Sequence, residues 1–193
     1  DVGDKVNDNI RINGNDLRCK VIGEGGNLGL TQRGRIEYAL NGGKINTDSI
    51  DNAAGVDCSD HEVNIKIALV QAMKSGKISL TERNKILESM TLEVEDMVLD
   101  DNLLQTQAIT MSQSKGVSMI GDHARFLSRL EKIGLLNRQV EFLPSEKQID
   151  KRQSDRIGMT RPELSVMLSY AKMDLYNNII NSKLIKDPYF EDI

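Results

Sequence analysis

Tryptophan is absent from this sequence of 193 residues, and aromatic residues make up only 4% of it. A hydrophobic core must therefore be built mostly from leucine, isoleucine, valine and methionine, which favours packed helices over a large β-sandwich. Hydrophobic residues account for 39% and charged residues for 28% of the sequence, so the composition is that of a globular protein, not a disordered one.

The sequence is also poor in cysteine, in long apolar runs and in basic clusters. Its two cysteines, Cys19 and Cys58, predict no disulfide framework, and unpaired thiols suit a reducing cytoplasm. No apolar run reaches the roughly 18 residues of a membrane-spanning helix, and no signal peptide is visible. The net charge is −4 without a long basic stripe. We therefore expect a cytoplasmic protein with neither nucleic acid nor a membrane as partner.

The first part of the sequence alternates strand-like and helix-like segments. Residues 17–22 and 44–50 are β-prone, Thr31 can cap a helix over 32–40, and a further helix is expected from Ser59. The order strand, helix, strand, helix predicts a parallel sheet with crossover helices. Two strands are too few for a stable sheet, so the sheet must continue upstream or pack on the helical part.

The second part of the sequence, from about Leu80, is a series of helix-like segments. Thr81 can cap the first, which runs to Val98, and others are expected at 102–114, 118–133, from Ser145, and from Thr160 to about 179. We predict a mainly α fold with a small α/β part. A truncated Rossmann-like segment of two short parallel strands would be followed by a helical domain, with domains at 1–78 and 79–193.

The glycine-rich segment 23–31 (GEGGNLGLT) lies between a predicted strand and a predicted helix. Glycines there let a ligand approach the backbone, and a helix N-terminus favours an anionic or polar group. The dinucleotide fingerprint G-x-G-x-x-G nearly fits from Gly23, but Leu28 occupies the last glycine position. A tight turn without any ligand explains the glycines equally well.

A second loop of small residues, 51–57 (DNAAGVD), is expected between the second strand and the helix that Ser59 and Glu62 would begin as a capping box. Ligands of open α/β sheets bind outside the carboxyl ends of the strands, where both loops would meet. Asn52 offers a donor and an acceptor, and Ser59 a hydroxyl for a substrate carboxylate. Alternatively, Asn52 only forms the turn and Ser59 only caps the helix.

Two further expectations concern the helix after this loop. Its apolar side chains cover so much of its surface that we expect it to be buried; they include Val63, Ile67, Val70 and Met73. Only Cys19 and His123 could complete a tetrahedral metal site with Cys58 and His61, so we assign no metal and interpret Cys58 as a small apolar filler.

Together the two loops resemble the late Rossmann segment of amino-acid dehydrogenases of the glutamate dehydrogenase type. Those proteins carry E-G-A-N-x-x-T before a helix and N-A-G-G-V-x-x-S-x-x-E after the next strand. Here residues 24–27 (EGGN) stand for the first motif, with Gly26 in place of alanine, and residues 52–62 stand for the second, with Ala54 in place of glycine. Residues 17–67, 159–170 (MTRPELSVMLSY) and 187–190 are similar to the large NAD-specific class found in bacteria.

The resemblance implies an oxidoreductase of amino-acid catabolism that oxidises L-glutamate to 2-oxoglutarate and ammonia, with NAD as the hydride acceptor. It implies cofactor contacts for Glu24, Gly25, Gly26, Asn27 and Asn52, and substrate contacts for Asn52 and Ser59. The catalytic lysine, the catalytic aspartate and the pyrophosphate loop of the family have no match in this sequence. We therefore assign no catalytic residue and expect an inactive C-terminal fragment, whose partners are the rest of the parent chain and, in a homo-oligomer, further copies.

Two other classes of protein are compatible with parts of the sequence. A nucleotide-binding regulatory domain without chemistry would need a complete phosphate loop, which is missing here. A helical interaction module would account for the second part of the chain, but it has no use for Asn27, Asn52 and Ser59 gathered at strand ends. We therefore favour the dehydrogenase interpretation.

Overall fold

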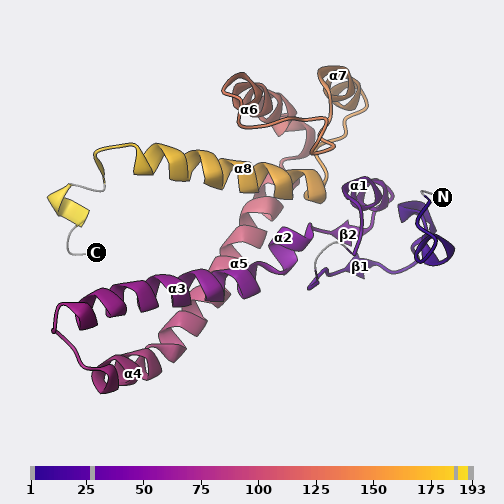
Figure 1. Cartoon of the computed structure of the whole chain (residues 1–193). Helices are drawn as coiled ribbons and strands as arrows, with labels where there is room; N and C mark the ends of the chain where they lie inside the picture. Colours follow the sequence, from indigo (N-terminus) through magenta and orange to yellow (C-terminus); the bar gives the residue numbers. More distant parts are fainter. Residues whose placement is uncertain (1–2, 27–28, 185–186, 191–193) are drawn as a thin grey trace. The chain divides into compact units, whose positions relative to one another are not determined.

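The structure, a computed structural model, describes residues 3–26, 29–184 and 187–190 (Figure 1). Helices make up 68% of it, and the strands β1 (Val21–Ile22) and β2 (Lys44–Ile45) pair in parallel, with Val21 opposite Lys44. The mainly α fold with two short parallel strands is thus confirmed. Within the described ranges, no helix is both long and apolar enough to cross a membrane.

The chain divides into two compact units, which we describe separately. The first unit consists of Asp1–Gly23, Leu30–Thr47 and Ile109–Ile193, and the second of Glu24–Gly29 and Asp48–Ala108. Helix α5 (Thr91–Ser114) belongs to the second unit up to Ala108 and to the first from Ile109.

In the first unit, helix α1 (Gln32–Leu40) connects the two parallel strands. The Thr31 hydroxyl accepts a hydrogen bond from the Gly34 amide at 3.1 Å, which confirms the predicted N-cap. After the helix, Gly42 adopts a φ of +89°, a left-handed conformation that glycine tolerates and that turns the chain into β2. The buried Tyr38 of α1 donates to the Cys19 carbonyl at 2.7 Å and so fixes the helix beside the segment that leads into β1.

The remaining helices of the first unit are α6 (Ile120–Lys132), α7 (Glu146–Ser154) and α8 (Arg161–Ile180), with short 3₁₀ turns η1 (Asp8–Ile10), η2 (Gly14–Asp16), η3 (Gly116–Met119) and η5 (Pro188–Phe190). Gly134, at a φ of +74°, ends α6, and the Leu135 amide donates to the Leu130 carbonyl at 3.0 Å, as expected for a glycine C-cap. The core of this unit consists of buried apolar side chains: Tyr38, Ile45, Ile109, Ile120, Leu127, Leu130, Leu136, Leu143, Ile149, Met159, Leu164 and Met167.

The N-terminus of α8 is held by a buried ion pair. Glu163 is 1% exposed and accepts hydrogen bonds from the Thr160 amide at 2.7 Å and the Thr160 hydroxyl at 2.8 Å, which confirms the predicted capping box. The Arg152 guanidinium donates to both oxygens of Glu163 at 2.7 and 2.8 Å. This bidentate pair neutralises a carboxylate that would otherwise be costly to bury.

The sheet packs on the same end of α8. The Arg161 Nε donates to Asn46 Oδ1 at 2.9 Å, and Gln32 Nε2 donates to the Pro162 carbonyl at 3.1 Å, so both β2 and α1 contact α8. A two-stranded sheet was expected either to continue upstream or to pack on the helical part. The structure shows that it packs on the helical part.

The second unit contains α2 (Asp48–Asp51), α3 (Ala53–Lys74), α4 (Leu80–Ser89) and most of α5. In Figure 1, α3 and α4 form a helical hairpin, which turns at Gly76 with a φ of +73°. The prediction that Thr81 caps α4 is wrong, because Ser79 caps it and forms a capping box with Glu82. The prediction that this helix runs to Val98 and is followed by a new one at 102 is also wrong, because α4 ends at Ser89 and α5 continues from Thr91 through both positions.

The predicted loop at 51–57 is wrong, because α3 begins at Ala53 and includes most of it. Consecutive alanines have the highest helix propensity, and this outweighs the turn signal of the small residues. Ser59 therefore lies inside the helix and does not cap it, and Glu62 pairs with Lys66 one turn later instead of forming a capping box.

The expected burial of α3 is also wrong, because none of its residues is buried. Val63 is 50%, Ile67 57% and Val70 39% exposed. An apolar stripe is buried only where another layer covers it. Among the described residues of this unit, α3 is paired with α4 near the hairpin turn but is not enclosed.

Candidate functional site

Two predicted site residues, Asn52 and Ser59, lie on one face of α3. Asn52 immediately precedes Ala53, the first residue of α3. Ser59 lies seven positions after Asn52, which is nearly two helical turns. The two side chains therefore project from the same side of the helix, about 10 Å apart along its axis. The helix, not a loop, sets the spacing between them.

The Ser59 side chain has no structural role in the described part of the chain. It is exposed, and its hydroxyl makes no hydrogen bond to another described residue. Ser128 and Ser165, which also lie inside helices, instead donate to the carbonyls of Ala124 and Arg161 at 2.9 and 2.8 Å. Capping cannot explain Ser59 either, so its hydroxyl is available to a ligand.

The Asn52 backbone is fixed at the N-terminus of α3. Its amide donates to the Asp48 carbonyl at 2.8 Å, and its own carbonyl accepts from the Gly55 amide at 3.2 Å. Its side chain makes no capping hydrogen bond, and Oδ1 lies over Gly55, where a Cβ would come within 3.1 Å. This places the carboxamide at a helix N-terminus, where the backbone dipoles favour polar or anionic groups.

The glycine-rich loop is tied to the same region through Asp51, a residue that the sequence analysis did not single out. The Glu24 amide donates to Asp51 Oδ2 at 2.9 Å, and the Glu24 side chain is 5% exposed. Glu24 is thereby held next to the residue that precedes Asn52. Gly25 and Gly26 follow it, while Asn27 lies outside the described residues. Only the folded chain shows the role of Asp51, because the two residues are 27 positions apart.

Gly25 and Gly26 have open space beside their backbone. Neither has a positive φ, and a Cβ added to either would meet no described atom within 4 Å. Gly43, by contrast, is required by packing, because a Cβ there would overlap the Tyr38 ring. The described structure therefore requires glycine at neither position, and the open backbone leaves room for a ligand to approach.

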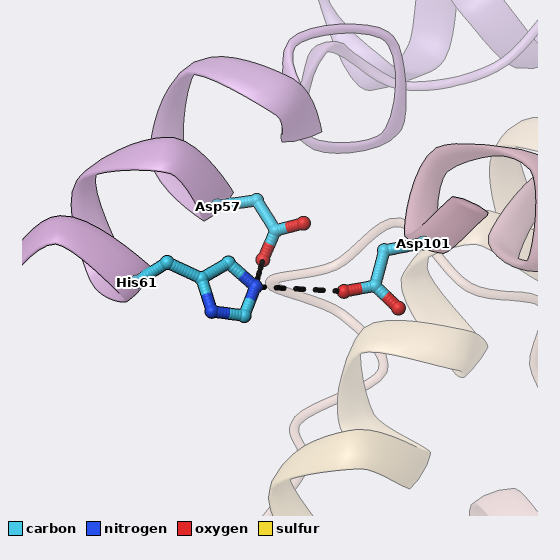
Figure 2. Close-up of side chains that lie close together, drawn as sticks. All are labelled: Asp57, His61 and Asp101. Carbon is cyan, nitrogen blue, oxygen red and sulfur yellow. Dashed lines mark ion pairs between the residues drawn. The ribbon is translucent and has the colours of Figure 1, made fainter. Parts of the chain in front are cut away.

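A second polar cluster in this unit was missed by the sequence analysis. His61 Nε2 lies 3.7 Å from Asp57 Oδ1, one turn away on α3, and 3.9 Å from Asp101 Oδ2 on α5 (Figure 2). Burial raises the pKa of the Asp57 carboxyl, the charge of Asp101 raises it further, and His61 lowers it. The spacing D-x-x-x-H of residues 57–61 was a signal for this pair, whereas the exposed Cys58 is not part of it.

The comparisons with known proteins identify the class to which the chain belongs. Residues 1–112 match the family described as bacterial NAD-glutamate dehydrogenase, catalytic domain, and residues 156–193 match the family described as glutamate dehydrogenase, C-terminal. Because the first match covers more than half of the sequence, the chain belongs to the bacterial NAD-glutamate dehydrogenase family.

Individual relatives carry the name NAD-specific glutamate dehydrogenase. The protein of Halomonas elongata is 50% identical over 97% of this chain, that of Pseudomonas aeruginosa 49% over 98%, and that of Mycobacterium tuberculosis 47% over 95%. The chain spans 12% of the length of the first two relatives and 11% of the third. The predicted resemblance to the large NAD-specific class is confirmed.

Proposed function

We propose that this chain is part of an NAD-dependent glutamate dehydrogenase that converts L-glutamate to 2-oxoglutarate and ammonia. Family membership gives the class of reaction. The observation that carries the assignment of the site is the shared face of α3, on which Asn52 and Ser59 project without a capping role. The Ser59 hydroxyl makes no hydrogen bond to another described residue, so the fold of the helix does not require it.

In this proposal, Ser59 donates a hydrogen bond to a carboxylate of glutamate. Asn52, about 10 Å away along α3, lies near the nicotinamide and the substrate. Glu24, Gly25, Gly26 and Asn27 contact the nicotinamide ribose region of the cofactor. When bound, NAD would supply the hydride acceptor, and these residues would hold the nicotinamide and the substrate next to each other.

The chain supplies binding residues but no catalytic residue, because the lysine, the aspartate and the pyrophosphate loop of the family have no counterpart in its sequence. We infer that the 193 residues alone have no turnover. The Rossmann-like character of the strands, the domain division after residue 78, a cytoplasmic location and a homo-oligomeric parent protein belong to the same proposal.

Replacing Asn52 by alanine tests the proposed function in the intact protein that contains this chain. Asn52→Ala should lower kcat/KM for glutamate-dependent NAD reduction by about tenfold or more, because a hydrogen bond in a desolvated site is lost. Asn64→Ala is the matched control, since Asn64 is an exposed residue on another side of α3. Equal kcat/KM for Asn52→Ala and the control would refute the site, and absence of glutamate-dependent NAD reduction by the unsubstituted protein would refute the function.

A further inference from the structure

We propose that Asp57, His61 and Asp101 form a binding site for a divalent metal ion of the zinc type, which links α3 to α5 in the second unit. This goes beyond the proposed glutamate dehydrogenase function and departs from the sequence-based expectation of no metal. Figure 2 shows the arrangement, in which the two carboxylates flank one ring nitrogen of His61.

The distances between the donor atoms are close to those of a metal site. His61 Nε2 is 3.7 and 3.9 Å from the two carboxylate oxygens, and one donor atom from each residue lies within 4.8 Å of the others. Zinc bonds of about 2.0–2.2 Å in a tetrahedral site hold neighbouring ligand atoms roughly 3.4 Å apart. Side-chain adjustments of less than an ångström would therefore let all three donors reach one ion.

Two polar atoms of this cluster are shielded from solvent, although the His61 and Asp57 side chains are 26% and 24% exposed. His61 Nε2 and Asp57 Oδ2 are shielded from water and have no hydrogen-bond partner in the described part of the chain. The His61 contacts of 3.7 and 3.9 Å are too long for hydrogen bonds. Shielded polar atoms without a partner are rare, and an unplaced ion is one of the recognised reasons for them.

The donor chemistry suits a divalent ion of the first transition row. Two carboxylates and one neutral imidazole give a net charge of −2, which such an ion balances. Imidazole nitrogen favours zinc over magnesium or calcium, which prefer sites made of oxygen alone. Three protein ligands leave a fourth position for water.

The position on α3 separates this site from the proposed substrate face. Asp57 and His61 are one turn apart and share a face, whereas Ser59 lies two residues from each, about 200° around the helix. The ion would therefore bind on the side of α3 away from Ser59. Its role would be to fix α3 against α5 and so to hold the helix that carries Asn52 and Ser59 in place.

Metal titration of the intact protein after chelator treatment tests the site, with Zn²⁺ followed by calorimetry and Co²⁺ by its visible absorption. The unsubstituted protein should bind one more equivalent of Zn²⁺ than His61→Ala. Asp101→Asn should weaken binding at this site by at least about 100-fold, because loss of a direct ligand exceeds the 10- to 100-fold effect of losing an outer partner. Asp60→Asn and Asp100→Asn, which change neighbouring exposed carboxylates, should leave the titration unchanged.

The same variants distinguish a metal site from a protonated histidine that bridges two carboxylates. Equal Zn²⁺ stoichiometry and affinity in the unsubstituted protein, His61→Ala and Asp101→Asn would overturn the proposal. Unfolding curves recorded with chelator present should be similar for all variants, whereas Zn²⁺ should raise the Tm of the unsubstituted protein and of the two controls only. Glutamate-dependent NAD reduction is measured separately, so failure of the metal site leaves the proposed function untouched.

Discussion

The two units of the chain differ in how they are stabilised. The first unit buries a core around Leu127 and Leu130 and encloses the Arg152–Glu163 ion pair. In the second unit, the buried apolar side chains among the described residues are Ile50 and Val98, and α3 buries none. Yet the second unit carries the residues proposed to bind cofactor and substrate. Packing and binding are thus assigned to different parts of the chain, since side chains that must reach a ligand cannot also fill a core.

The largest expected difference between the units is the loss of stability when an ion pair is removed. Glu163→Gln should lower the free energy of unfolding by about 3–5 kcal/mol, because it leaves the Arg152 charge buried without its partner. Glu62→Gln, which removes the exposed pair with Lys66 in the second unit, should change it little. Urea unfolding of both variants measures the difference. Equal losses would mean that the second unit is as tightly packed as the first.

Substitution of glycine by alanine should affect stability differently in the two units. Gly43→Ala, in the first unit, should destabilise the fold by about 1–3 kcal/mol, because the new methyl group overlaps the Tyr38 ring. Gly25→Ala should leave the stability unchanged, since its Cβ meets no described atom, but should raise the KM for NAD about tenfold.

Gly23→Ala is the matched control for Gly25→Ala, because a Cβ at Gly23 also meets no described atom within 4 Å and Gly23 is not among the proposed cofactor contacts. It should preserve both the stability and the KM for NAD. If Gly25→Ala also left the KM for NAD unchanged, the loop would be a turn with no part in cofactor binding.

The smallest expected effect is the pH dependence of stability that His123 of the first unit produces. His123 is 7% exposed, its Nε2 lies 2.9 Å from the Ser112 hydroxyl, and burial lowers its pKa from 6.5. The unfolded chain therefore binds a proton that the folded chain does not, so stability should fall as the pH drops below 6.5 and level off below the lowered folded pKa. In His123→Gln, the free energy of unfolding should depend less on pH below 6.5, as measured by urea unfolding at a series of pH values. An unchanged pH profile would show that His123 is not the group responsible.

The sequence was sufficient to predict elements whose signals are local. Thr160 with Glu163, Thr31 and Gly134 each act through backbone groups within a few residues, and the structure places all three as expected. The parallel pairing of β1 and β2 was also predictable, because a helix between two strands requires a crossover.

The start of α3 could not be predicted because two local signals competed. Ser59 and Glu62 have the spacing of a capping box, but Ala53 and Ala54 extend the helix past it to Asn52. The contacts of Glu24 with Asp51 and of His61 with Asp101 depend on tertiary structure. Such contacts join residues 27 and 40 positions apart, and no periodicity encodes them.

The central claim is that the exposed face of α3 binds substrate, and the KM for glutamate of Ser59→Ala in the intact protein tests it most directly. Loss of a hydrogen bond to a carboxylate costs about 1.5–3 kcal/mol, which corresponds to a rise in KM of roughly 10- to 100-fold. Ser89→Ala, which changes an exposed serine of α4, should leave the KM for glutamate unchanged. A KM for Ser59→Ala equal to that of Ser89→Ala would contradict the account.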